Sequence, residues 1–474
     1  MDYTLIGFIV YLLIVLVVGF VTYRLNETHS DFFVGGRKLN PWVVAFSERA
    51  SGESAWLLLG LPGAALAAGF VSAWLAIGCI LGIAFYWFFI AKKLRIESEN
   101  LNAITLPGFF AKKFDDYNII RVLATLIIVF FFTFYLAAQF VGAGKILNVT
   151  FDIPIVQGMI IGAVVIIFYT MMGGFFAVAW TDLFQGILMI ATLVILPIAG
   201  MIELHESGAS LSGTIISQEG SSFVNMFNGK TGWAAIAVVI GGLSWGLGYM
   251  GQPHLLTRFM AIKNPGKLKV SRNIALAWAI PAFFGSIFIG LVGIALYSKG
   301  FFSDVENIMP YMATNLLPAW LAGVFISGAI AAMMSTADSQ LLVVSSSVIE
   351  DFYNKILGKN KPDNVLLNYS RIITIVVGIV AFFIAYTSED LIIELVSYAW
   401  SGLGASFGPA LLLMLYWRRT TKEGIVAGMI TGFVTTIVWK DIAVLDNFIT
   451  VRFTSFAFAF IAILVVSLLY NKKS

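Results

Sequence analysis

The sequence predicts an all-α membrane protein that crosses the bilayer about thirteen times. Of its 474 residues, 59% are hydrophobic and only 12% are charged, whereas roughly 25% of the residues of a soluble domain are charged. Apolar runs of about 20 residues, enough for a helix to cross the hydrocarbon layer, recur along the whole chain. Because only short loops separate them, we expect residues 1–474 to form a single transmembrane domain.

The apolar runs define the expected helices in order. The first run is too long for the core of a signal peptide and lacks both a basic n-region and an A-x-A site, so we expect it to be retained. The expected helices cover residues 3–24, 41–68, 71–91, 119–144, 153–173, 182–202, 231–251, 274–298, 317–348, 370–387, 391–416, 424–440 and 449–470.

The cations in the loops predict the orientation in a cell membrane, plasma or inner. When alternate loops are assigned to opposite sides, most of the 29 Lys and Arg residues, Arg258 among them, fall on one side. Cytoplasmic loops carry the excess of Lys and Arg, so we expect the N-terminus outside and the C-terminus in the cytoplasm. The cations on the outer side are Lys145, Lys230, Lys299, Lys440 and Arg452.

The composition argues against enzymes and nucleic-acid-binding proteins. The chain has only three histidines and one cysteine, and no catalytic or metal-ligand spacing is present. We therefore expect no enzyme activity and no cofactor. The net charge of +3 is scattered over short loops, so nucleic acid is not an expected partner.

Two predicted helices are interrupted by Gly, Pro and polar residues, at 47–63 and at 241–254. With the first helix set aside, they are the first helices of two successive five-helix groups. Matched interruptions of this kind indicate a transporter site near the bilayer midplane. The alternative is that the glycines only allow neighbouring helices to pack closely.

Charged residues within predicted helices are candidates for function because an ionised side chain is costly in the bilayer. Arg49, Glu53, Asp182 and Asp338 stand out. Asp182 begins the sixth predicted helix, where an N-cap role is the alternative. Glu48 lies nearer the cytoplasmic end of its helix, where we expect water to reach it.

Hydroxyl groups surround Asp338 in the ninth predicted helix. Ser335, Thr336, Asp338 and Ser339 occupy adjoining positions of one turn. Hard cations such as sodium prefer oxygen ligands, which these side chains and the carbonyls of a broken helix supply. The alternative is that the hydroxyls bond back to carbonyls of their own helix.

Aromatic residues lie near both interruptions and not at the membrane interfaces, where Trp and Tyr usually gather. They are Trp56, Tyr135, Trp245 and Tyr249. They are candidates to enclose the apolar part of a solute.

Several strings together resemble the sodium:solute symporter family, most closely its sodium/proline symporter branch. The likeness covers nearly the whole chain. The strings are Gly35-Gly36-Arg37, Ser54 and Trp56 with Leu57 to Ala64, Ala179-Trp180-Thr181-Asp182, Trp245 to Tyr249, Gly251-Gln252-Pro253-His254, Ala331 to Thr336, and Leu395 to Trp400.

The resemblance implies a LeuT-type core of two inverted five-helix repeats, 41–202 and 231–416, with one helix before (3–40) and two after (424–470). It implies a sodium site from the backbone of Ala50 and Glu53, the carbonyl of Ala332, and the hydroxyls of Ser335 and Thr336. A second ion site of some relatives maps to Asp182, Ser335, Asp338 and Ser339. Substrate contacts map to Ser54, Trp56, Tyr135, Trp245, Tyr249 and Gln252.

One departure bears on coupling. The proline branch typically has Asp then Met where this chain has Gly52 then Glu53, and it lacks the pair Glu48-Arg49. Three roles stay open for Glu53, which are to replace the missing carboxylate, to titrate and couple protons, or to pair with Arg49.

The favoured function is sodium-coupled symport of proline or a similar small amino acid into the cell by alternating access. The main alternative is a symporter of the same fold that couples to protons or takes a carboxylate held by Arg49. A transporter-like membrane sensor is less favoured.

Overall fold

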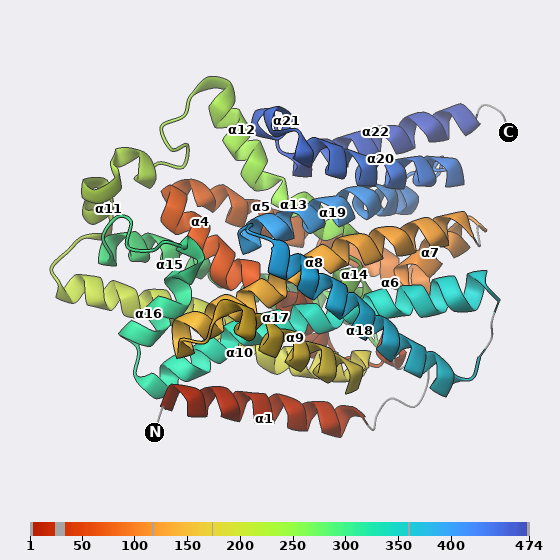
Figure 1. Cartoon of the computed structure of the whole chain (residues 1–474). Helices are drawn as coiled ribbons and strands as arrows, with labels where there is room; N and C mark the ends of the chain where they lie inside the picture. Colours follow the sequence, from red (N-terminus) through yellow and green to blue (C-terminus); the bar gives the residue numbers. More distant parts are fainter. Residues whose placement is uncertain (1–2, 24–33, 116–117, 173, 359–360, 472–474) are drawn as a thin grey trace.

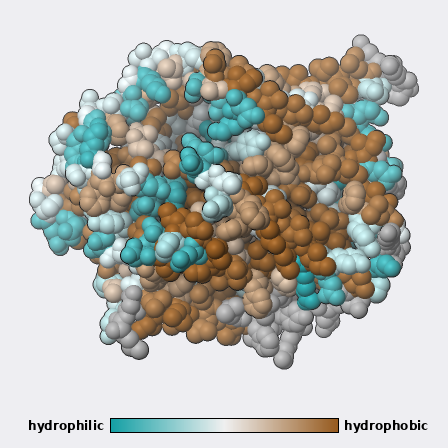
Figure 2. Space-filling model, in the orientation of Figure 1, coloured by the Kyte–Doolittle hydropathy of each residue, from teal (hydrophilic) through white to brown (hydrophobic). Residues whose placement is uncertain are grey.

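The computed structural model describes residues 3–23, 34–115, 118–172, 174–358 and 361–471. Long helices cross the molecule side by side (Figure 1), and Figure 2 shows a broad apolar region between more polar ends. Within these ranges, nine helices are long and apolar enough to cross a membrane. The chain is therefore a multi-pass membrane protein, whereas the total of thirteen crossings stays a prediction.

Each expected segment coincides with a helix in the structure, and this helix is either continuous or broken. The uninterrupted helices have apolar faces all round or nearly so, as helices between lipid and protein require. They are α1 (Tyr3–Tyr23), α8 (Ile119–Phe151), α9 (Ile155–Met172), α10 (Phe175–Glu206), α15 (Leu268–Leu296), α17 (Ala319–Ser346), α18 (Asp363–Thr387), α19 (Ile392–Tyr416), α20 (Lys422–Asp441) and α22 (Val451–Asn471).

Shorter helices connect them or lie at the ends of the bundle. The third predicted segment contains α5 (Ala73–Phe85), which continues through a π-helical turn, η4 (Tyr86–Ile90), into α6. The other short helices are α6 (Ala91–Asn100), α7 (Leu106–Lys113), α11 (Leu211–Glu219), α16 (Ile308–Leu316) and α21 (Ala443–Phe448).

The second segment is broken where the sequence predicts. Its first part, α3 (Pro41–Gly52), begins with the Asn40 side chain accepting hydrogen bonds from two backbone N–H groups, and Pro41 needs no such partner. Glu53 leaves the helical region at φ −110° and ψ 63°. The chain resumes in η2 (Trp56–Gly60) and α4 (Leu61–Ala68).

The seventh segment is broken in the same way. It comprises α12 (Gly232–Leu243), α13 (Trp245–Gly248), η6 (Tyr249–Gly251) and α14 (Pro253–Ala261). Gln252 has an extended backbone, with φ −82° and ψ 106°. The following Pro253 is restricted to a helix start because it has no N–H to donate. The two breaks thus occupy matching places in the two predicted repeats.

Glycines bring the second broken helix against its neighbours. A Cβ atom built on Gly246 would lie 2.2 Å from the carbonyl oxygen of Gly78 in α5. One built on Gly242 would lie 2.4 Å from the Cβ atom of Trp74. Close packing and helix interruption therefore occur together in this segment. Its glycines can allow close helix packing and also belong to a break of the kind found at transporter sites.

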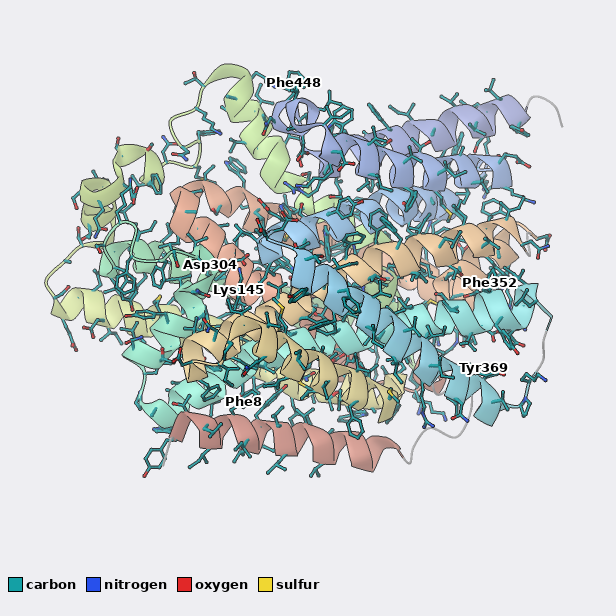
Figure 3. All side chains as sticks on the ribbon, in the orientation of Figure 1. Phe8, Lys145, Asp304, Phe352, Tyr369 and Phe448 are labelled. Carbon is teal, nitrogen blue, oxygen red and sulfur yellow. The ribbon has the colours of Figure 1, made fainter. Side chains whose placement is uncertain are left out.

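An ion-paired cluster ties α8 to the start of α19. The Lys145 ammonium lies 2.5 Å from Glu306 and 2.7 Å from Asp304. Figure 3 shows Lys145 and Asp304 near each other. The buried Glu306 carboxylate also accepts the N–H groups of Ile392 and Ile393, at 3.0 and 3.1 Å, and so caps α19.

The glycine contact makes a prediction about stability. Gly246→Ala places a methyl group against the backbone of α5, so we expect the free energy of unfolding to fall by about 1–3 kcal/mol, as in other overpacked cores. The matched control is Gly241→Ala, where a Cβ atom meets nothing within 4 Å. Melting temperatures of both purified variants in detergent check this, and equal melting temperatures would contradict it.

Candidate functional site

The hydroxyls of α17 face the break that follows α3. The Ser335 hydroxyl donates 2.9 Å to the Ala50 carbonyl and lies 3.1 Å from the Ala332 carbonyl, and the Thr336 hydroxyl donates 2.9 Å to the Ser51 carbonyl. All these side chains are fully buried. Only part of this bonding is within α17, so the hydroxyls do more than bond back to their own helix. The arrangement gathers hydroxyl and carbonyl oxygens of the kind that hard cations prefer.

Asp182 lies in the interior of α10. The helix begins at Phe175 and its N-cap residue is Gly174, so the alternative of an N-cap role for Asp182 is wrong. Its Oδ2 atom instead accepts a hydrogen bond of 2.6 Å from the Ser47 hydroxyl and one of 3.1 Å from the Ser51 hydroxyl. Asp182 therefore joins α10 to the first broken helix.

Arg258 was counted with the loop cations of the expected cytoplasmic side, whereas the structure places it within a helix, α14. Its side chain is fully buried in α14. The guanidinium lies 3.2 Å from Asp182 Oδ2, donates 2.8 Å to the Ser51 hydroxyl and also bonds the Ser339 hydroxyl. A fixed positive charge thus lies among the oxygens of the expected second ion site.

Asp338 lies close to this group. Its Oδ1 atom accepts a hydrogen bond of 3.2 Å from the Ser339 hydroxyl, and its Oδ2 atom is buried and has no hydrogen-bond partner among the residues that the structure describes. The structure therefore brings Asp182, Ser335, Asp338 and Ser339 into one neighbourhood, with Arg258 as a member that the sequence did not suggest.

A second buried charge cluster lies on the other side of the same break. Arg49 binds Glu48 through two nitrogens, Glu53 at 2.7 Å and the hydroxyl of Tyr86 at 2.8 Å. Glu48 is fully buried, so the expectation that water reaches it is wrong. The Tyr249 hydroxyl donates 2.8 Å to the same oxygen of Glu53, and within the described ranges Glu53 Oε2 has no hydrogen-bond partner. The Glu53 side chain therefore contacts η6 of the second broken helix through Tyr249.

The aromatic residues of the two breaks pack against one another. The rings of Trp56 and Trp245 are stacked, with centroids 5.1 Å apart. Tyr249 meets Trp400 edge-on at 4.7 Å, and the Trp400 indole N–H donates 2.9 Å to the Trp245 carbonyl. These rings, with Tyr135 at 6.3 Å from Trp400, form a closed aromatic cluster.

Polar side chains border this cluster. The Ser54 hydroxyl lies 3.4 Å from the Tyr135 hydroxyl. Gln252 donates 3.3 Å to the carbonyls of both Gly248 and Trp400, and its buried Oε1 atom has no hydrogen-bond partner in the described part of the chain. All six expected substrate residues therefore lie at or between the two breaks.

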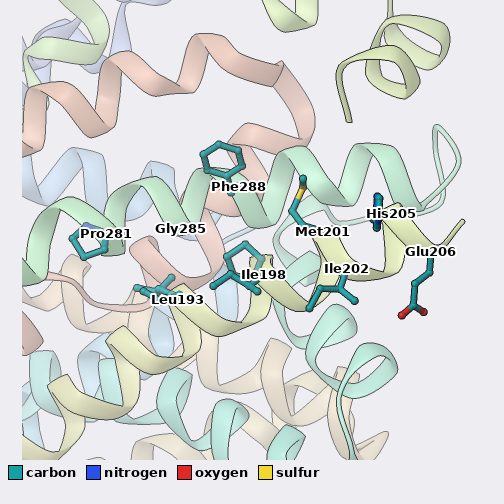
Figure 4. Close-up of a pocket in the computed structure, with 11 residues that line it drawn as sticks. Leu193, Ile198, Met201, Ile202, His205, Glu206, Pro281, Gly285 and Phe288 are labelled. Atoms are coloured by element: carbon teal, nitrogen blue, oxygen red, sulfur yellow. The ribbon is translucent and has the colours of Figure 1, made fainter. Parts of the chain in front are cut away.

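Two cavities help to delimit the site. One of about 410 Å³ has Trp245 in its wall and lies at one end of α12, α19 and α22. Another, of about 580 Å³, lies between α10 and α15 (Figure 4), with walls that are mainly aliphatic and include Pro197 and Pro281. None of the expected site residues lines the second cavity, so it is separate from the site.

Sequence reasoning missed several members of the site. Trp400 belongs to a string that carried the family resemblance, but no role was attached to it. Arg258 follows the second break by only a few residues, and this spacing was the available signal. Tyr86 is one of many aromatics, and nothing in the sequence marks its contact with Arg49.

Comparisons with known proteins agree with this geometry. A model of the sodium:solute symporter family matches residues 32–432. The chain is 38% identical to the sodium/proline symporter of Escherichia coli K12, over 99% of the chain and 94% of the relative. It is 39% identical to the high-affinity proline transporter PutP of Bacillus subtilis, over 97% of the chain and 96% of the relative.

Solved structures bear on the fold. A sodium-coupled sialic acid symporter in a substrate-bound, outward-open state matches with a TM-score of 0.79 and 20% identity, over 99% of the chain and 98% of its own. MhsT in complex with L-phenylalanine matches with a TM-score of 0.59 and 16% identity, over 91% of the chain and 98% of its own. The expected LeuT-type transporter fold is confirmed. The chain belongs to the sodium:solute symporter family.

Proposed function

We propose that this protein takes up proline or a similar small amino acid together with sodium, by alternating access. The observation that carries the proposal is the pair of hydrogen bonds from Ser335 and Thr336 of α17 to the carbonyls of the first break. The family supports sodium as the coupling ion. The names of the relatives in Escherichia coli and Bacillus subtilis support proline as the solute.

In the proposed sodium site, oxygens from two helices surround the ion. The ligands are the carbonyls of Ala50, Glu53 and Ala332 and the hydroxyls of Ser335 and Thr336. Helix carbonyls freed at a break are suited to this role because they carry partial negative charge and lack their usual partners. Ser335 already lies within hydrogen-bond distance of two of the proposed carbonyl ligands.

A second ion at Asp182, Asp338 and Ser339 is the weaker part of the proposal. The guanidinium of Arg258 contacts two of these residues, and like charges repel strongly in a medium of low dielectric constant. A second cation can bind at this position in two ways. Either Arg258 moves away, or Asp182 and Asp338 are both ionised, so that their two negative charges exceed the single positive charge of Arg258.

The solute is proposed to bind between the breaks. Trp56, Trp245 and Tyr249 provide apolar faces, and Ser54, Tyr135 and Gln252 provide polar contacts. Because the rings now pack on one another, the solute has to separate at least one pair of them. Alternating access fits this requirement, since in such transporters one group of helices moves against another around the binding site.

The alternative in which Arg49 holds a carboxylate solute is less well supported. Each terminal nitrogen of Arg49, and its Nε atom, already has a partner in Glu48, Glu53 or Tyr86. A carboxylate solute that bound Arg49 would have to displace Glu48 or Glu53, and the displaced carboxylate would be left as a buried charge without its cation. We therefore assign Arg49 to positioning Glu53 and thereby Tyr249.

We also propose that the N-terminus faces the outside and the C-terminus the cytoplasm. The distribution of Lys and Arg over the loops supports this orientation. The cavity that reaches Trp245 then opens to the outside.

The coupling ion can be tested by transport. Uptake of labelled proline into proteoliposomes should require sodium and should increase with an inside-negative potential, because each translocated charge contributes about 2.3 kcal/mol per 100 mV. Replacing sodium with choline at fixed pH should abolish accumulation. Unchanged uptake in choline, lost when a proton gradient is collapsed, would contradict sodium coupling and favour protons.

The solute site can be tested at Trp245. We expect Trp245→Ala to raise the apparent KM for the solute by tenfold or more, because truncating a large aromatic contact typically costs about 2 kcal/mol or more. Sodium binding, measured by isothermal titration, should persist. The control is Trp320→Ala, whose ring is exposed in α17. A wild-type KM in Trp245→Ala would remove this residue from the site.

The three roles of Glu53 predict different results. Because its carboxylate contacts Arg49 and Tyr249, we expect Glu53→Gln to weaken solute affinity more than sodium affinity. Arg49→Gln should lower the free energy of unfolding by about 3–5 kcal/mol, because it leaves two buried carboxylates without their cation. Solute and sodium affinities and melting temperatures of both variants measure this.

Two results would contradict the positioning role of Glu53. A loss confined to sodium affinity in Glu53→Gln would make the carboxylate part of the ion site. A pH dependence of wild-type transport that disappears in Glu53→Gln would make it the proton-coupling group.

A further inference from the structure

A polar cavity lies at the outer end of the second broken helix, outside the proposed solute site. Its volume is about 410 Å³, and its walls come from α12, α19, α21 and the start of α22. Figure 1 shows α12 and α21 together at one end of the bundle, and Figure 3 labels Phe448, one of the lining residues, there. Trp245 forms part of the wall, so the cavity adjoins the proposed site.

Two cations, Lys440 and Arg452, line this cavity, and Arg452 contacts Trp245. It belongs to α22, one of the two helices that follow the predicted repeats. Its guanidinium lies over the ring of Trp245, 4.8 Å from the centroid. It donates 2.5 Å to the Ser397 hydroxyl, 3.2 Å to the Gly241 carbonyl and, at 3.4 Å, to the Ser244 hydroxyl. These contacts fix the position of the guanidinium but do not neutralise its charge.

Within the part of the chain that the structure describes, Arg452 makes no ion pair. The cavity contains two carboxylates, and neither contacts it. Asp446 accepts the N–H of Val451 at 2.7 Å, and Glu394 is exposed. Every other arginine that lies deep in the protein and is described above has a carboxylate partner. A partly buried guanidinium without one attracts an anion into the cavity.

The position of Arg452 relates this anion to the transport route. Trp245 has Arg452 over its ring and is itself stacked on Trp56. A solute entering from the outside therefore meets the guanidinium before it can separate the two indole rings. An amino acid carries a carboxylate, which matches the fork of N–H donors of an arginine.

We propose that Arg452 and the surrounding cavity form an outer docking site for the carboxylate of the incoming solute. The solute first pairs with Arg452 and then passes Trp245 to the site between the breaks. This inference rests on the proposed function, because it takes the solute to be an amino acid that enters from the outside. It assigns a binding role to a helix beyond the two repeats.

The first test compares binding kinetics of Arg452→Gln with those of the wild type. We expect Gln to lower the association rate constant of the solute about tenfold, within the range over which charge steers association. The dissociation rate constant from the inner site should change less. The fall in association rate with added salt should also be smaller, because the steering charge is gone. Stopped-flow tryptophan fluorescence measures both rate constants.

A purely structural role for Arg452 predicts a different result for Arg452→Gln. If the arginine only held α22 to α12 and α19, its loss would lower the melting temperature without changing the salt dependence of association. Lys230→Gln is the control for general surface charge, because Lys230 is an exposed cation on the proposed outer side. The salt dependence of association should be larger in Lys230→Gln than in Arg452→Gln. Equal salt dependence in these two variants would overturn the proposal.

A second pair of variants tests the site with Arg452 in place. Ser397→Asp puts a carboxylate where the Ser397 hydroxyl now accepts from Arg452, so it should neutralise the guanidinium while keeping its contact. Ser397→Asn has a similar shape and no charge. We expect the KM for the solute to be about tenfold higher in Ser397→Asp than in Ser397→Asn, as for loss of one charge-assisted hydrogen bond.

The results separate this inference from the proposed function. If the wild type shows no sodium-dependent uptake of amino acids, the proposed function fails and the inference fails with it. If the wild type transports an amino acid but Ser397→Asp and Ser397→Asn have the same KM, only the outer docking site is overturned. This comparison remains decisive even if Arg452→Gln does not fold.

Discussion

Two helices stop inside the membrane, and the backbone groups freed at these breaks must find partners within the protein, because lipid offers none. At the first break, the carbonyls of Ala50 and Ser51 accept hydrogen bonds from Ser335 and Thr336. At the second break, the carbonyl of Trp245 accepts the indole N–H of Trp400. The partners come from α17 and α19, so the need to satisfy two breaks determines which helices surround the proposed site.

Two arginines form ion pairs with the buried carboxylates of the same region. Arg49 is enclosed by Glu48 and Glu53, and Arg258 lies against Asp182. An ion pair of this kind is costly to bury and more costly to break. Arg49 and Glu48 belong to α3, whereas the pair of Asp182 and Arg258 joins α10 to α14 and contacts α3 through Ser51. A cation entering the proposed sodium site would therefore act on two charge clusters whose members belong to three helices, α3, α10 and α14, and to the first break.

The sequence was sufficient for the helices and for the two breaks, because apolar length and Gly or Pro punctuation are local signals. It was not sufficient for Asp182, which lies inside α10 since that helix starts seven residues before it, at Phe175. Helix ends are poorly marked where apolar residues continue on both sides. The buried position of Arg258 was missed for a related reason, because a buried arginine and a loop arginine look alike in the sequence. Its partners Asp182 and Ser51 lie far away along the chain and become neighbours only in the fold.

The solute and the ion are proposed to share one short segment of chain, and this gives a physical basis for coupling. The Trp56 indole N–H donates 3.2 Å to the Gly52 carbonyl, and the neighbouring Ser51 carbonyl accepts from Thr336. Moving Trp56 to admit a solute therefore changes a hydrogen bond one residue away from an oxygen at the proposed ion site. Coupling between two ligands requires that each favours the same state of a shared element. We propose residues 50–56 as such an element, in which the carbonyls would bind the ion on one side and the aromatic and polar side chains would bind the solute on the other.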